Sequence, residues 1–573
     1  MKTVAIFGAG ISGLSAAHEL AEKGWYVQVH EKLDEPGGVA RSHRETSTSA
    51  PSEYSWRGYA PWYHNVYDLM KRIPINNDKT VYDELSRPVE FVFTKNRDTL
   101  FGQLSLKDRA RIFFEIARSA VASPKRVAVY ATINAADYLK PKMSLKGWKQ
   151  FTAMFGPWVG IDPQRASLHH VMSFFVKNII PGSPSPYLHS DKDGVWSSGS
   201  CDKWLVFDKP TNEAWFEPWV KHLEKMGVTF HFGSSMQKIE YNNSSLVTSM
   251  IVKDNTHNVT KVKVDHYISA ISPFEMHDVM KRSGLFDETK QFENLIQDGP
   301  HVQVSFRIGF NKMFSWPGIR RAVILSESEF NITMYRQDEF WKHNVSLGHE
   351  IKSLWSGTTC VSYKPGSLFG KPIANLTRNQ FQREILHQLS KDVGFNDMLH
   401  ETNKKSFSEM LPNVVHFEVW KSFKFVPNQI INYEPKYVDS TNTRPYQPTT
   451  KTLMSNLWLA GGHTKTSTEL WSMESAAEGG RRAADMITGS RDTIIQDKGV
   501  VLGLCENIDG VLFTLGMPNV IDVFVILVII LIVYAITYRY WHSAVVPIDG
   551  GSIVGGWPMD SVHLLTNSRT SRG

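Results

Sequence analysis

Cysteine is scarce in this 573-residue sequence, which contains only Cys201, Cys360 and Cys505. Three cysteines that lie far apart exclude a disulfide framework and a CxxC zinc site, and they favour a thiol-reducing compartment. Charged residues make up 21% and hydrophobic residues 42% of the chain, which excludes a disordered chain, a coiled coil and a polytopic membrane protein. The net charge of +6 is small and the basic residues are scattered, so no nucleic-acid partner is expected.

Motifs of several other protein classes are also missing. The sequence has no GxSxG turn and no Ser-His-Asp order, so it gives no support to hydrolase chemistry. The His169-His170 pair has no third ligand at metal spacing, so it is interpreted as structural and no metal is expected. A signal peptide is not expected either, because the chain passes from Met1 almost directly into an apolar strand over 4–7.

A long apolar run stands near the C-terminus. Residues 523–537 read VFVILVIILIVYAIT, carry no charge, and are followed by aromatic residues of the kind found at membrane interfaces. With its flanks the run reaches 519–541, which is long enough for a single transmembrane helix. A buried element of the core is the alternative. The membrane interpretation predicts a linker over 491–518, a flexible tail over 542–573 and a catalytic domain that faces the cytosol.

A glycine turn follows the N-terminal strand in the order Gly8-Ala9-Gly10-Ile11-Ser12-Gly13 and opens a helix. Gly8 permits the tight turn, Gly10 lets the backbone approach a pyrophosphate, and Gly13 lets the helix pack closely on the strand. The phosphates would lie at the helix N-terminus, where free N–H groups and the helix dipole favour an anion. This pattern predicts a dinucleotide site.

An acidic residue completes this half of the predicted site. The strand over 26–30 ends at Glu31, which comes 18 residues after Gly13. A carboxylate there can accept hydrogen bonds from both ribose hydroxyls, and it repels a 2′-phosphate, so NADP is not expected in this site. Shortly afterwards Gly37-Gly38 allow a second close approach to the phosphates, and Arg41 is a candidate to neutralise their charge.

A second motif stands near residue 460. A buried strand ends in Gly461-Gly462, and a helix over 473–487 begins after Ser472, which is a candidate N-cap. Small residues recur along one face of this helix and allow close packing. Free N–H groups at the helix start can face the electron-rich edge of a flavin and stabilise its reduced anion.

These segments resemble the FAD-dependent amine oxidase and phytoene desaturase superfamily. The turn, the acid and the glycine doublet match its opening signature, and NLWLAGGHTK followed by SMESAAEGG is similar to its closing flavin motif. The chain departs from the family at Val39, where Arg is common, and at Gly462, where an acid is common. The resemblance implies bound FAD, whose predicted binding residues are Gly8, Gly10, Ser12, Gly13, Glu31, Lys32, Gly37, Gly38, Arg41, Met236, Gly461, Gly462 and Met473.

The predicted fold is α/β, with a Rossmann-type FAD-binding domain and an inserted α+β substrate domain. Helical spacing is seen over 104–180, several short strands over 229–272, and an alternating, half-buried strand over 301–310. The FAD-binding domain is expected over 1–75, 229–275 and 450–490, and the substrate domain over 76–228 and 276–449.

The middle of the chain is less informative. Residues 53–67 contain six aromatics around one arginine, and the resemblance places this segment beside the flavin. Candidates for a hydrophobic substrate wall are therefore Trp56, Tyr59, Trp62 and Tyr63, with an ordinary core as the alternative. Lys312 follows a strand as the flavin-side lysine of amine oxidases does, although a surface lysine is the simpler interpretation. No catalytic residue is predicted.

The resemblance implies hydride removal from an organic, apolar, isoprenoid-like substrate, as in desaturases. The alternatives are an amine oxidase that releases hydrogen peroxide, a flavin mutase, and a non-catalytic, membrane-anchored flavin-binding protein. No second glycine turn with a strand and an acid follows the first, so a separate nicotinamide domain is not expected. The expected partners are a small-molecule substrate and a membrane. The electron acceptor and the oligomeric state are left open.

Overall fold

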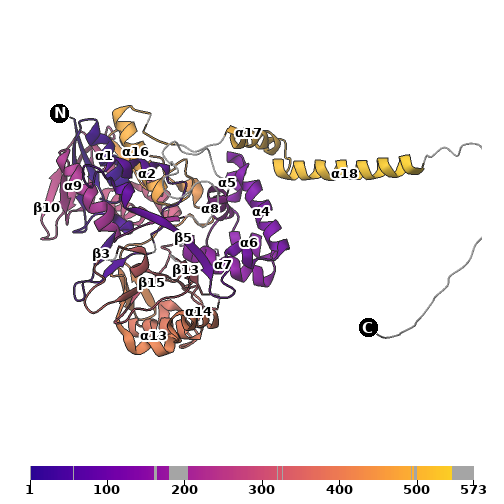
Figure 1. Cartoon of the computed structure of the whole chain (residues 1–573). Helices are drawn as coiled ribbons and strands as arrows, with labels where there is room; N and C mark the ends of the chain where they lie inside the picture. The colour runs from indigo at the N-terminus through magenta and orange to yellow at the C-terminus, as the bar shows by residue number, and fades with distance from the viewer. Residues whose placement is uncertain are drawn as a thin grey trace, which may run out of the picture. The chain divides into compact units, whose positions relative to one another are not determined.

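The computed structural model describes residues 2–55, 57–159, 164–179, 204–318, 321–325, 327–342, 344–491, 493–495 and 500–544. Residues 1–520 form one compact unit, and residues 521–573 form a second. Figure 1 shows the chain coloured from indigo at the N-terminus to yellow at the C-terminus.

A five-stranded parallel sheet lies in the core of the first unit, with the strand order β19-β11-β1-β2-β7. Parallel strands that are covered on both faces need apolar residues at successive positions, which β1 supplies with Val4, Ala5, Ile6 and Phe7. All five strands fall within the three segments predicted to form the FAD-binding domain. Their bounds are β1 (Thr3–Phe7), β2 (Tyr26–Glu31), β7 (Thr229–Phe232), β11 (His266–Ser269) and β19 (Leu457–Leu459).

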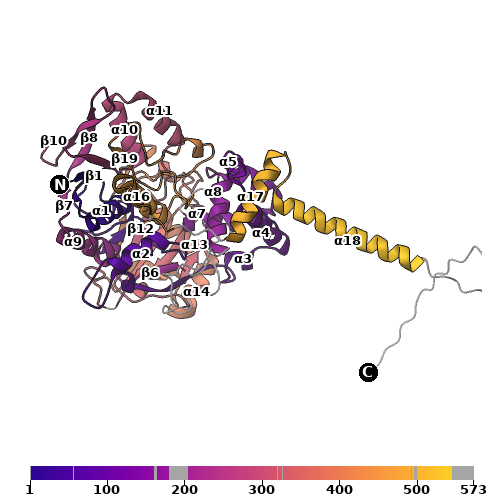
Figure 2. The same cartoon turned by 90° about the horizontal axis from the view of Figure 1, so that it is seen from above.

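Helices α1 (Ile11–Glu22) and α16 (Met473–Thr488) pack against each other beside this sheet (Figure 2). Their close approach depends on Gly480, because a Cβ atom there would lie 2.1 Å from the backbone oxygen of Ser12. The stripe of small residues predicted on the second helix therefore joins the two halves of the nucleotide signature, which are far apart in sequence.

A seven-stranded sheet is formed by the two segments predicted to make up the substrate domain. Its strand order is β16-β12-β15-β14-β13-β5-β6. The alternating residues of 301–310 predict a half-buried strand, but every residue of β12 is buried. That expectation was wrong because both faces of β12 are covered. Phe306, Ile308 and Phe310 join a hydrophobic cluster, and the polar Ser305 and Arg307 donate hydrogen bonds to the backbone oxygen of Glu53 instead of facing water. The bounds are β5 (Leu85–Phe93), β6 (Trp204–Phe207), β12 (Ser305–Phe310), β13 (Arg321–Ile324), β14 (Thr333–Arg336), β15 (Ser353–Thr358) and β16 (Val414–Val419).

Helices follow β5 along the chain, as the spacing over 104–180 predicts, and three antiparallel strands stand beside the nucleotide sheet. The helices are α4 (Leu106–Ala120), α5 (Pro124–Tyr130), α6 (Ala135–Leu139), α7 (Leu145–Val159) and α8 (Leu168–Ile179). The small sheet consists of β8 (Ser235–Tyr241), β9 (Val247–Lys253) and β10 (Val259–Val262), with α10 (Pro273–Ser283) packed on it.

The C-terminal segment differs in part from its prediction. Within the predicted linker the structure has a helix, α17 (Val500–Thr514), which packs on α5 because its Asp509 binds Arg126. Helix α18 (Val520–Ala544) contains the apolar run, and over Val520–Trp541 it is long and apolar enough to cross a membrane, with a mean hydropathy of 3.0. None of that stretch is buried, which disfavours the alternative of a core element. The predicted tail lies outside the described residues from 545 onward.

Candidate cofactor site

A cavity of about 590 Å³ lies at the carboxyl ends of the nucleotide-sheet strands, and its wall combines both predicted motifs. All thirteen predicted cofactor-binding residues except Gly13 line it. Gly13 lies behind the turn, where a Cβ atom would come within 1.9 Å of the backbone oxygen of Gly8, so it serves the close packing of helix on strand.

The glycine turn is built as the sequence predicts. Gly8 has φ of 104°, and a Cβ atom there would lie 2.7 Å from the backbone oxygen of Ala270. Helix α1 begins after Gly10 with no side-chain cap, and Ile11 and Ser12 face the cavity, so its first N–H groups are available to an anion. The backbone N–H of Gly37 donates to the oxygen of Ala9 across 2.8 Å and brings the glycine doublet onto the turn.

Glu31 stands at the end of β2 with its side chain buried. Its carboxylate accepts hydrogen bonds from the backbone N–H groups of Ala9, at 2.7 Å, and Leu33, at 3.0 Å. Burial raises the pKa of Glu31, and these two N–H groups oppose that rise. The acid is therefore fixed beside the glycine turn, and its role as the ribose ligand stays a prediction.

Arg41 also lines the cavity, but its charge is already balanced. Its guanidinium forms ion pairs with Glu35, at 2.7 Å, and with Glu434, and it lies 5.2 Å from the ring of Trp420. A second basic residue of the predicted set, Lys32, is likewise paired with Glu275. The expected neutralisation of phosphate charge by Arg41 stays a prediction, since the anion would compete with two carboxylates.

The closing motif forms the opposite wall. The hydroxyl of Ser472 accepts a hydrogen bond from the backbone N–H of Ser475 at 3.2 Å, which confirms Ser472 as the N-cap of α16. His463, which follows the glycine pair, is buried against Tyr437, and burial lowers its pKa to about 4, so it is neutral at physiological pH. Thr464 donates its hydroxyl to the oxygen of Gly461 and is therefore already engaged.

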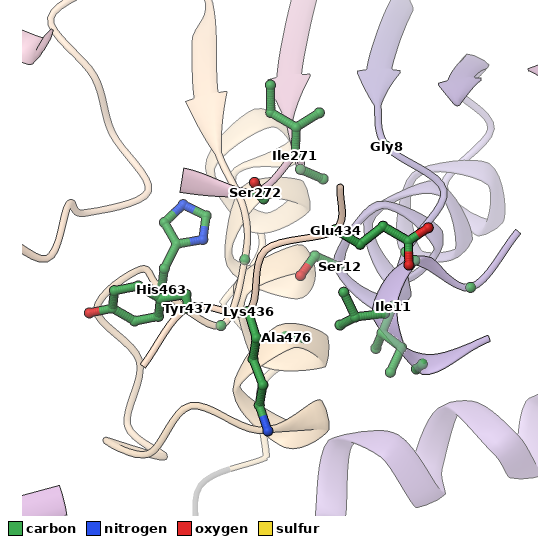
Figure 3. Close-up of a pocket in the computed structure, with 18 of the residues that line it drawn as sticks. Gly8, Ile11, Ser12, Ile271, Ser272, Glu434, Lys436, Tyr437, His463 and Ala476 are labelled. Atoms are coloured by element: carbon green, nitrogen blue, oxygen red, sulfur yellow. The ribbon is translucent and has the colours of Figure 1, made fainter. Parts of the chain in front are cut away.

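A third wall, the segment 434–437, has no counterpart in the sequence analysis. Lys436 lies in the cavity lining, donates to Oε1 of Gln303 at 3.0 Å and has its ammonium 5.2 Å from the ring of Trp471. Burial lowers the pKa of Lys436 to about 8. Figure 3 shows Lys436, Tyr437 and His463 on the side of the cavity opposite Gly8, Ile11 and Ser12. The only sequence signal is a lysine in an extended, proline-containing stretch, which indicates nothing by itself.

Four of the aromatic residues that line the cavity pack on one another and are called its aromatic part: Trp62, Tyr63, Phe174 and Trp204. One buried amide, that of Asn178 on α8, binds three of them: its oxygen lies 3.4 Å from Nε1 of Trp62 and 3.2 Å from Nε1 of Trp204, and its nitrogen donates to the backbone oxygen of Phe174. The indole N–H groups are thus satisfied in the wall, and the ring surfaces that remain for the cavity are apolar.

The other candidates from the sequence lie elsewhere. Tyr59 packs against Phe207 and Trp215 in the core and does not line the cavity. Trp56 lies outside the described residues. Lys312 is exposed and is not part of the cavity lining, so the position of the flavin-side lysine is not the one that the resemblance suggests.

The residues present fit FAD. The uncapped start of α1 suits a pyrophosphate, and the carboxylate of Glu31 suits a ribose. The start of α16, at Met473, lines the opposite wall of the same cavity. The cavity volume is within the range of sites for small molecules and cofactors.

Two family models match the chain. Residues 6–73 match the NAD(P)-binding Rossmann-like domain, and residues 216–488 match the flavin containing amine oxidoreductase. Among curated proteins, hydroxysqualene dehydroxylase of Rhodopseudomonas palustris is 51% identical over 47 residues, which are 8% of this chain and 11% of the relative. That match therefore covers only a small part of either protein.

Solved structures share the fold over most of the chain. Cyclohexylamine oxidase from Brevibacterium oxydans has a TM-score of 0.55 at 14% identity, covering 85% of this chain and 99% of its own. A putative protoporphyrinogen oxidase from Exiguobacterium has a TM-score of 0.54 at 12% identity, covering 86% and 99%. From the two family matches and this shared fold, the chain belongs to the FAD-dependent amine oxidase superfamily, and its cofactor is FAD.

Proposed function

We propose that the protein is an FAD-dependent oxidoreductase of the desaturase type, which removes a hydride from an apolar, isoprenoid-like substrate. The observation that carries the proposal is the aromatic part of the cavity, whose indole N–H groups are held by Asn178. A wall with its polar atoms engaged favours a hydrocarbon over a sugar. The short match to hydroxysqualene dehydroxylase, whose name denotes an isoprenoid substrate, supports the same class.

The aromatic wall stands beside the start of α16. Asn65 lies in α2 (His64–Arg72), two residues after Tyr63. Its backbone N–H donates a hydrogen bond to the carboxylate of Glu474, in the first turn of α16, at 2.8 Å. Bound FAD supplies a two-electron acceptor for the hydride. The aromatic rings orient the substrate and exclude water, while the N–H groups at the helix start favour negative charge near them.

Loss of a hydride leaves a proton to be removed from the neighbouring carbon. Among the described residues that line the cavity, Lys436 has a basic nitrogen whose pKa of about 8 is suited to this step. Its Nζ is oriented by the hydrogen bond to Gln303. We therefore include Lys436 in the proposal as the group that accepts the proton.

Anaerobic mixing of the purified protein with candidate substrates tests this function. An isoprenoid substrate should bleach the flavin absorbance band, whereas primary amines should not. Bleaching by an amine with peroxide release on reoxidation would instead identify an amine oxidase. A protein that binds FAD but is reduced by neither class would favour the flavin mutase or the non-catalytic alternative.

We also propose that α18 anchors the protein in a membrane, with residues 1–520 in the cytosol. The support is the exposed apolar stretch Val520–Trp541. The full-length chain should sediment with membranes and resist carbonate extraction. A chain that ends at Val520 should lose its resistance to carbonate extraction and keep FAD, because every cofactor residue precedes it. A cut at residue 510 would divide α17.

A further inference from the structure

Helix α17 has a continuous apolar face that no described residue covers. Its five members recur at steps of three and four residues and therefore lie along one side of the helix. Their exposed fractions range from 45% to 74%, in a protein whose other large apolar side chains are mostly buried. The members of this face are Val501, Leu504, Ile508 and Val511 of the helix, and Leu515 directly after its end.

The opposite side of α17 is fixed to the first unit by a buried carboxylate. Asp509 is fully buried and accepts hydrogen bonds from Nε of Arg126, at 2.9 Å, and from the backbone N–H of Ser123, at 2.8 Å. The guanidinium of Arg126 also lies 5.1 Å from the ring of Phe513. Helix α17 lies beside α5 (Figure 2). This polar attachment sets the rotation of α17, so its apolar side chains are left exposed on the other side.

The same attachment holds the first residue of the apolar span. The backbone N–H of Val520 donates to Oδ1 of Asp509 at 3.3 Å, and the side-chain amide of the preceding Asn519, which is buried, donates to the backbone oxygen of Arg118 at 3.1 Å. The stretch that begins at Val520 is therefore tied at its start to the middle of α17. A membrane entered by that stretch therefore lies within reach of α17, whose apolar face is the side not bound to α5.

The charges along α17 suit a lipid surface. Its acidic residues are the buried Asp509 and the half-buried Glu506, and the outward face itself carries no ionised side chain. Lys125 of α5 lies at the end of the face, with Nζ 3.2 Å from Oγ1 of Thr514. A lysine at the edge of an apolar helix face can reach lipid phosphates while the helix lies in the interfacial plane.

We propose that α17 is a second membrane-contacting element, which lies along the surface of the bilayer that α18 crosses and inserts its apolar face among the lipid chains. The inference rests on the proposed anchor. Covalent continuity with the span favours lipid as the occupant of this face over a second copy of the chain or another protein. The catalytic unit would then be held at the membrane in one orientation, where an apolar substrate is concentrated.

Site-specific fluorescence on the full-length FAD-loaded chain tests the proposal. In a background with Cys201→Ser and Cys505→Ser, a bimane label is placed by Ile508→Cys on α17. Matched labels are placed by Ile529→Cys on α18 and by Val259→Cys on β10, whose side chains are 54% and 62% exposed. The protein is reconstituted in vesicles of phosphatidylcholine and phosphatidylserine, with or without brominated acyl chains, and iodide is added from the water.

Brominated lipid should reduce the emission at positions 508 and 529 by about twofold or more and leave position 259 unchanged, whereas iodide should quench only position 259. Iodide quenching at 508 with lipid quenching at 529 would overturn the role of α17 and leave the anchor standing. Iodide quenching at both would overturn the anchor and the inference together. A label at 508 shielded from both quenchers, with energy transfer between labelled chains, would assign the face to a second copy and overturn the proposal.

Discussion

The indole N–H of Trp204 donates a hydrogen bond to the side-chain oxygen of Asn178, across 3.2 Å. The two residues come from β6 and α8, on either side of a segment that lies outside the described residues. Because Trp62 shares the same acceptor, one small amide determines how the aromatic part of the cavity is arranged.

Replacement of Asn178 by Leu tests this arrangement. Two buried indole N–H groups would lose their acceptor, at a cost of about 1–3 kcal/mol each. We expect thermal stability to fall, and substrate affinity to fall more than FAD affinity. Equilibrium titrations with FAD and with an apolar substrate measure the two. Asn178→Asp, which keeps an acceptor for both indoles, should retain more of the substrate affinity; equal losses in both variants would show that the acceptor does not matter.

Glu31→Ala should weaken FAD binding at least tenfold. The change removes the acceptor proposed for two ribose hydrogen bonds, and bonds to a charged group contribute about 1.5–3 kcal/mol each. It also leaves the N–H of Ala9 without its partner in the glycine turn. Fluorescence titration of the apoprotein with FAD measures the effect. Asp34→Ala, a change in the loop just after β2, is the control, and unchanged affinity in Glu31→Ala would remove this residue from the site.

Gly480→Ala should separate α1 from α16. The added Cβ atom would lie 2.1 Å from the backbone oxygen of Ser12, so backbone must move, and overpacking of this kind costs about 1–3 kcal/mol or more. FAD retention after gel filtration and the melting temperature should both fall. Gly503→Ala in α17 is matched in chemistry, but its Cβ meets no atom within 4 Å, and it should be neutral or slightly stabilising. Similar behaviour of the two variants would contradict the close-packing argument.

Lys436 should make the apoprotein more stable as the pH rises above about 8. Burial lowers its folded-state pKa to about 8 from an ordinary value of 10.5, so the unfolded chain binds more protons between these values. Stability therefore increases with pH through this window and is reduced below it. Chemical denaturation of apoprotein at pH 7 and pH 10 should show the trend, and Lys436→Met should flatten it and raise stability at pH 7 by at most about 3 kcal/mol.

The same lysine gives a kinetic prediction for the holoenzyme. If neutral Lys436 accepts the proton, flavin reduction by substrate should accelerate as pH rises through about 8. Lys436→Met should lose that step and Lys436→Arg should remain slow at all pH values, with FAD still bound. A profile that is the same in wild type and Lys436→Met would exclude Lys436 as the proton acceptor.

NADPH should reduce the flavin slowly or not at all. The glycine turn that the sequence offers belongs to the cavity described above, and Glu31 at its edge repels a 2′-phosphate. Anaerobic stopped-flow mixing with NADPH measures the rate. Rapid, stoichiometric bleaching would mean that a nicotinamide site exists elsewhere and that the protein is closer to a reductase or monooxygenase.

The nucleotide half of the site could be predicted from the sequence because its chemistry depends on backbone conformation. Gly8, Gly10 and Gly13 stand within one turn, and Glu31 ends the next strand, so local spacing determines their geometry. The same is true of the Ser472 cap, whose acceptor and donor are three residues apart. The short strands expected over 229–272 also depend on short-range pattern, and β7 to β11 lie there.

The substrate half could not be predicted because its contacts are made between distant residues. Lys436 donates to Gln303, and Asn178 binds Trp62 and Trp204. These residues are far apart in the sequence, and the periodicity of hydrophobic residues does not indicate which distant side chains meet. The helix α17 was missed for a related reason: its stability comes from the buried pair of Asp509 and Arg126, whereas its two glycines and its position between flexible-looking stretches indicate a linker.

The order of strands in the nucleotide sheet has a consequence for synthesis on the ribosome. Strands β1 and β2 are synthesised first. The other neighbour of β1 is β11, at residues 266–269, and the outer neighbour of β11 is β19, at residues 457–459, so both pair only later. During most of translation the sheet therefore has an unpaired apolar edge, and such edges are where incomplete chains associate wrongly. Substitutions that delay the docking of β11 or β19 should lower the yield of folded protein in cells even when the finished molecule tolerates them.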